Sequence, residues 1–118
     1  MAKDPRAILN ELQSGMTALG KADEERMQAF KAFMGAAEKP GVLDSKTKEL
    51  IATAIGLAVR CEYCIVYHVY AALKAGATRE ELIETAFETI VMGGGPAVTY
   101  SATLFLDSIN TFAPDFGK

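Results

Sequence analysis

The stretch ELIATAIGLAVRCEYCIVYH, residues 49–68, decides how the middle of this chain folds. Its apolar residues recur at helical spacing, so helix is expected on both sides of Arg60. One helix could run through the whole stretch, because neither glycine nor proline marks a break near Arg60. Glu49 and His68 would then lie about 28 Å apart, at 1.5 Å per residue. A break before Cys61 would instead let the first helix fold back and bring Glu49 beside His68.

The same stretch holds Cys61, Cys64 and His68, the only cysteines and the only histidine of the chain. Taken singly, a buried cysteine or histidine is ordinary core packing. Their spacing favours chemistry, because residues four apart share a helix face and His68 can therefore take the Cys64 proton. The positive end of a helix dipole would lower the thiol pKa of Cys61, so the order of the two thiols stays open.

A Cys61–Cys64 disulfide places a condition on the backbone. Side chains three apart within a helix hold their Cβ atoms about 5 to 6 Å apart, whereas a disulfide needs about 3.8 Å. The pair therefore suits a helix N-terminus, where Cys61 can leave helical geometry. The loop that this bond would close is too short to stabilise a fold, so a disulfide here would serve chemistry.

Composition and capping signals predict a single all-α domain. Of the 118 residues half are hydrophobic, only 8% are aromatic and none is tryptophan, which is typical of closely packed helices. The first two helices would form an amphipathic hairpin within residues 1–40, before a motif-bearing core at about 43–100. Six helices and no strands are expected, over roughly residues 5–20, 24–37, 46–60, 61–75, 79–92 and 96–112.

Charge and hydropathy argue against several classes of partner. The net charge is -3 and the basic residues are scattered, so nucleic acid is not expected to bind. No apolar run reaches the roughly 18 to 20 residues of a membrane span, and the charged start MAKDPRAILNELQ is unlike a signal peptide. We therefore expect a cytoplasmic protein that binds no membrane.

The helix expected over residues 61–75 has almost no polar face. A helix that is apolar all round must be buried on every side, and a chain of this size has few other helices to surround it. Subunit contacts are expected to complete the burial, which predicts a homo-oligomer. The apolar positions are Ile65, Val66, Tyr67, Val69, Tyr70, Ala71, Ala72, Leu73 and Ala75.

The pattern Glu, eleven residues, Cys-x-x-Cys, three residues, His resembles the signature of the alkylhydroperoxidase-D-like branch of the carboxymuconolactone decarboxylase family. The flanking sequences LDSKTKELI, AALKAGATREELIETA and MGGGPA look like the same family, so the resemblance covers about residues 43–100. It implies an all-helical fold that assembles into trimers or hexamers. It also implies a thiol peroxidase or disulfide reductase site at the start of a helix, without a cofactor.

The resemblance also implies a role for each residue. Cys64 would be the thiol that reacts with peroxide, Cys61 its resolving partner, and His68 with Glu49 the proton relay. A thioredoxin-like or lipoyl-bearing protein would be the reductant, and the sequence does not select between them. Some members place a second histidine just before the second cysteine, where this chain has Tyr63, which predicts a weaker peroxidase.

Two alternative functions also fit the sequence. True decarboxylases of a muconolactone carboxylate resemble this chain in fold but in general lack the cysteine pair, so Cys61 and Cys64 argue against that activity. Metal binding is the other alternative, because Cys61, Cys64, His68 and Glu49 are four candidate ligands of a kind that zinc accepts.

Overall fold

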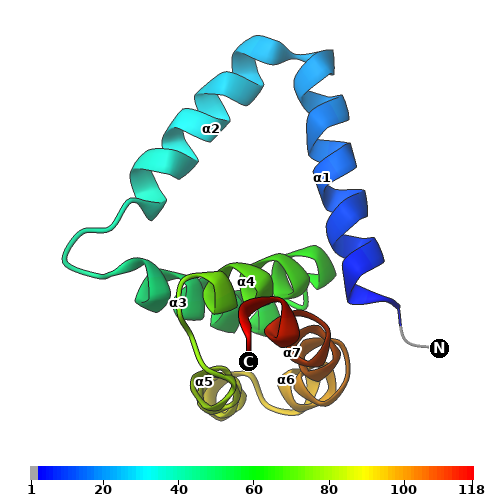
Figure 1. Cartoon of the computed structure of the whole chain (residues 1–118), viewed down its shortest axis with the longest axis vertical. Coiled ribbons are helices and arrows are strands. Elements are labelled where there is room, and N and C mark those ends of the chain that lie inside the picture. The colour runs from blue at the N-terminus through cyan, green and yellow to red at the C-terminus, as the bar shows by residue number, and fades with distance from the viewer. Residues whose placement is uncertain (1–2) are drawn as a thin grey trace.

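The computed structural model describes residues 3–118, which form helices and connecting turns without a strand (Figure 1). A π-helical turn, Ser101–Phe105, joins the last two α-helices into one continuous helix, and a 3₁₀ turn, Ala113–Phe116, follows it. Counted this way, the predicted all-α fold of six helices is confirmed. The α-helices are α1 (Pro5–Ala22), α2 (Glu24–Glu38), α3 (Ser45–Ala58), α4 (Glu62–Lys74), α5 (Arg79–Gly93), α6 (Gly95–Tyr100) and α7 (Leu106–Phe112).

Short polar side chains start four of these helices, at the positions that the sequence predicts. Asp4, Asp23 and Asp44 each accept a hydrogen bond from a backbone N–H in the first turn of α1, α2 and α3 respectively. Thr78 and Glu81 form a complete capping box at the start of α5. These caps satisfy N–H groups that lack a partner within the helix, so local sequence alone fixes where the helices begin.

Helices α1 and α2 occupy the region where the sequence predicts an amphipathic hairpin. They diverge from their junction as an open V (Figure 1). Only Asp23 separates α1 from α2, and an antiparallel helix pair needs a loop of about two to five residues. As a result α2 leaves Phe30 and Phe33 in solvent, at 46% and 67% exposure, while Ile8 and Leu9 attach the first half of α1 to the core.

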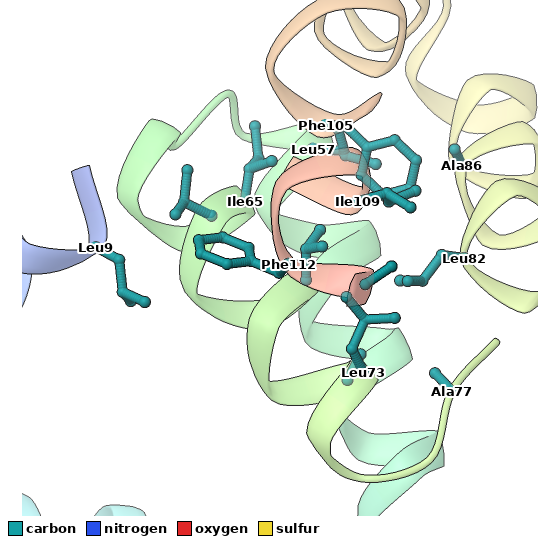
Figure 2. Close-up of a cluster of buried hydrophobic side chains, with 14 of the residues drawn as sticks. Leu9, Leu57, Ile65, Leu73, Ala77, Leu82, Ala86, Phe105, Ile109 and Phe112 are labelled. Carbon is teal, nitrogen blue, oxygen red and sulfur yellow. The ribbon is translucent and has the colours of Figure 1, made fainter. Parts of the chain in front are cut away.

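Helix α4 lies at the centre of the core, between α3, α1 and the helix that ends in α7 (Figure 2). Five of the nine apolar positions expected to be buried are at most 1% exposed within the single chain, whereas Tyr67 is 38% exposed, so the other helices of the chain cover α4 only in part. The homo-oligomer stays a prediction. Further exposed apolar surface lies on α2, α3 and α5. The buried α4 residues are Ile65, Val66, Val69, Ala72 and Leu73, and the exposed residues on α3 and α5 include Ile51, Ile55, Phe87, Val91 and Met92.

Candidate redox site

The chain breaks between α3 and α4 at Arg60, which has a left-handed backbone (φ 58°). The Cys61 N–H donates to the Gly56 carbonyl at 3.0 Å, and the Arg60 N–H donates to the Leu57 carbonyl at 3.3 Å. This pair of bonds is a Schellman motif, which usually has glycine where this chain has Arg60. Because Arg60 is not a glycine, the sequence did not decide between one helix and two. The structure shows two helices, α3 and α4.

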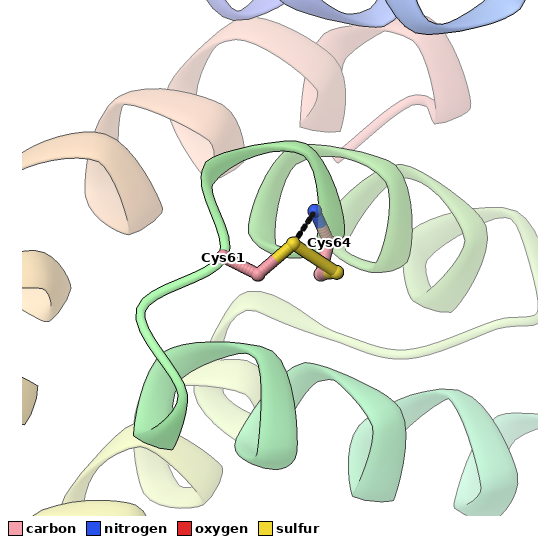
Figure 3. Close-up of a disulfide and its surroundings, with 2 residues drawn as sticks. All are labelled: Cys61 and Cys64. Carbon is pink, nitrogen blue, oxygen red and sulfur yellow. Dashed lines mark hydrogen bonds between the residues drawn. A yellow bond between two sulfur atoms is a disulfide. The ribbon is translucent and has the colours of Figure 1, made fainter.

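Cys61 is the N-cap residue of α4 and has an extended backbone (φ −93°, ψ 106°). This departure from helical geometry lets it form a disulfide with Cys64, at a Cα–Cα distance of 5.2 Å (Figure 3). The Cys61 Sγ also accepts the Cys64 backbone N–H at 3.2 Å, as a capping serine oxygen would. Both cysteines are partly exposed.

Gly56 permits the close approach of α3 to this turn. A Cβ atom at Gly56 would lie 3.1 Å from the Cβ of Cys64 and 3.4 Å from the Ile65 nitrogen. Any larger residue would push the two helices apart at the disulfide. Gly56 was not among the predicted site residues, although a glycine inside an otherwise helical pattern often marks a close contact.

The fold-back of α3 brings Glu49 to His68, 19 positions later in the chain. The Glu49 Oε1 lies 3.0 Å from the His68 Nδ1, and the two side chains are 13% and 17% exposed. A carboxylate at Nδ1 holds the proton there in the neutral imidazole and leaves Nε2 as the acceptor. Tyr67 packs edge-on against the same ring at 4.9 Å between centroids. Burial is the main cause that raises the Tyr67 pKa, so its hydroxyl stays protonated at neutral pH.

A hollow of about 700 Å³ lies beside Cys61. Cys61 and Arg60 line it from the turn, and Glu11 lines it from α1, whereas Cys64 does not reach it. Cys61 is therefore the sulfur that an external molecule in this hollow would meet first. Cys64 lies one helical turn from His68, on the same face of α4.

The four residues do not converge as a set of metal ligands. The two sulfurs are bonded to one another, and among residues 3–118 no three His, Cys, Asp or Glu side chains surround a position for a metal ion. The ligand cluster that a zinc site requires is therefore not formed in this disulfide state.

Comparison with known proteins shows the family of the chain. The sequence model of the carboxymuconolactone decarboxylase family matches residues 24–107, more than half of the chain. The chain belongs to this family. The match extends beyond residues 43–100 on both sides and takes in α2, so the resemblance first drawn from the cysteine motif is confirmed and widened.

Members of the family with solved structures share the whole fold. A family protein of Legionella pneumophila is 38% identical, with a TM-score of 0.83 over 97% of both chains. A family protein of Thermotoga maritima, for which a part in the antioxidative response has been suggested, is 25% identical, with a TM-score of 0.72 over 91% of this chain and 87% of that one.

An uncharacterized protein of Cupriavidus necator is also similar. It is 38% identical over 112 residues, which cover 93% of this chain and 99% of that protein.

Across residues 3–118, every helix is too short or too polar to cross a lipid bilayer.

Proposed function

We propose that this protein is a thiol-dependent peroxidase and disulfide oxidoreductase that takes part in antioxidant defence. The observation that carries the proposal is the Glu49–His68 contact, 3.0 Å long and largely buried, one helical turn from a Cys61–Cys64 disulfide. A thiol, a base and an acid that orients the base are the parts that an activated nucleophile needs. The suggested antioxidative role of the Thermotoga maritima relative supports the same chemistry.

The reaction starts from the dithiol. His68 takes the proton of the Cys64 thiol, and the resulting thiolate attacks the distal peroxide oxygen. The O–O bond breaks, and the alkoxide leaves as an alcohol with the proton that His68 returns. Cys64 is then a sulfenic acid, and the Cys61 thiol condenses with it, which forms the S–S bond and releases water. Glu49 holds His68 in place throughout and stabilises its charged form.

A partner dithiol closes the cycle. Its thiolate attacks Cys61, the sulfur that lines the hollow, and Cys64 leaves as a thiolate beside His68. The second partner thiol then displaces Cys61, so two electrons pass to the pair and the partner becomes a disulfide. A thioredoxin-like or lipoyl-bearing protein has this chemistry, and we expect it to meet the enzyme in the cytoplasm.

The surroundings of the two thiols support this order. Cys64 shares a helix face with His68, whereas Cys61 faces the hollow from the N-cap position. Cys64→Ser should therefore abolish peroxide consumption. Cys61→Ser should let sulfenic acid accumulate at Cys64 and oxidise further, because no resolving thiol remains. The opposite pattern would reverse the assignment.

Mass spectrometry of the native protein, reduced and then treated with peroxide, tests the proposal as a whole. We expect the loss of two hydrogens, mapped to the peptide that contains Cys61 and Cys64. Retention of both hydrogens after peroxide would contradict the peroxidase. A bound zinc atom in the reduced protein would favour the metal site instead.

A further inference from the structure

Both residues between the two cysteines are bonded to the N-terminal part of the chain, one to Lys3 just before α1 and one to α1 itself. The Lys3 Nζ lies 3.0 Å from a carboxylate oxygen of Glu62, and the Tyr63 hydroxyl donates a hydrogen bond to Glu11. The hydrogen bond to Glu11 is the main cause that raises the Tyr63 pKa, so the phenol remains the donor at neutral pH. The family match begins only at residue 24, so Lys3 and Glu11 both lie outside that match.

The same part of α1 forms a wall of the hollow in which Cys61 lies. Lys3 lines this hollow from the residues just before α1, Ile8 and Glu11 line it from the first two turns of α1, and Cys61 and Tyr63 line it from the start of α4. The charged groups of Lys3 and Glu11 therefore border the same space of about 700 Å³ as Cys61.

We propose that Lys3 and the first two turns of α1 belong to the redox site, where Lys3 and Glu11, together with Glu62 and Tyr63, set the equilibrium between the Cys61–Cys64 disulfide and its dithiol. The proposal rests on the redox function proposed above. Lys3 and Glu11 are positioning residues in this scheme, because they act through their charges and through Glu62 and Tyr63.

The direction of each effect follows from charge. Two electrons and two protons convert the neutral disulfide into a dithiol, and the dithiol can lose a proton to become a thiolate. A nearby positive charge stabilises the thiolate and a negative charge opposes it. Lys3 partly neutralises Glu62 and so favours the dithiol. Glu11 adds a negative charge to the hollow and so favours the disulfide.

Equilibration with reduced and oxidised glutathione tests the proposal, because two glutathione thiols supply the two electrons and become glutathione disulfide. Lys3→Met should shift the equilibrium towards the disulfide and Glu11→Gln towards the dithiol, each by about two- to fivefold at low salt, as expected for exposed charges. Glu11→Gln retains an oxygen that can accept the Tyr63 hydroxyl. Both shifts should shrink at high salt.

Matched controls lie at the far end of α1 and in α2. Lys21→Met lies 16 positions along α1 from its first residue, Pro5, about 24 Å at 1.5 Å per residue, and Glu25→Gln lies in the first turn of α2. Both should leave the equilibrium unchanged. Glu62→Gln should shift it in the same direction as Glu11→Gln, because it also removes a negative charge.

Opposite shifts for Lys3→Met and Glu11→Gln support the proposal. Shifts in the same direction would mean that both changes merely loosen this part of the chain. The absence of any shift would mean that Lys3 and Glu11 do not act on the sulfurs. Either result overturns the proposal. The assay needs no peroxide, so a protein that forms the disulfide without peroxidase activity would contradict the proposed function and leave this test intact.

Discussion

The left-handed residue that ends α3 gives a test of the break on which the site depends. A residue other than glycine costs roughly 1 to 2 kcal/mol in this conformation. Arg60→Gly removes that cost but makes the unfolded chain more flexible, which takes back about 0.4 to 1 kcal/mol. The net gain in the free energy of unfolding should be about 0.5 to 1 kcal/mol. For a domain of this size that corresponds to a melting temperature about 2 to 4 °C higher.

Arg60→Ala separates the backbone effect from the loss of charge, because alanine removes the guanidinium and keeps the Cβ atom. Thermal unfolding of the oxidised proteins, followed by far-ultraviolet circular dichroism, gives the three melting temperatures. We expect Arg60→Gly to exceed both the wild type and Arg60→Ala. Equal melting temperatures for the two variants would refute the argument that the Arg60 backbone is strained, since only the Cβ distinguishes them.

Four further predictions concern the rest of the site and the fold. Gly56→Ala should destabilise the protein by about 1 to 3 kcal/mol in urea unfolding, because its Cβ would lie 3.1 Å from that of Cys64; a neutral result would show that α3 can shift. Glu49→Gln should move the pH midpoint of Cys64 alkylation upward by roughly half a unit or more, because His68 loses its carboxylate, whereas the exposed Glu88→Gln should not. The Thr47 backbone N–H lowers the Asp44 pKa, so this carboxylate stabilises the fold above its unfolded pKa and ceases to do so as the pH falls through its native pKa. Asp44→Asn should therefore reduce the loss of stability at acid pH. Light scattering should return a mass of three or six times 12.6 kDa, and a stable monomer would contradict the homo-oligomer.

The helix starts could be predicted from sequence because their causes are local. Asp4, Asp23, Asp44 and Thr78 each bond to a backbone N–H within three residues, and a pattern of neighbouring residues carries that information. Their effect does not depend on where the rest of the chain lies.

The packing of the helices could not be predicted in the same way. The angle between α1 and α2 depends on the single residue that joins them, and the burial of α4 depends on α3, α1 and α7 covering it. Periodicity showed that α4 is apolar on all sides but not which surface covers it. The close contact at Gly56 likewise exists only once α3 and α4 lie side by side.

One backbone conformation accounts for both halves of the candidate site. The left-handed Arg60 ends α3, so Cys61 leaves helical geometry and can bond to Cys64. The same turn reverses the chain, so Glu49 and His68 lie 3.0 Å apart instead of the roughly 28 Å of an unbroken helix. A disulfide and an acid–base pair that looked like separate features of the motif are therefore two consequences of one break. Any change that restores helix through Arg60 should remove both together.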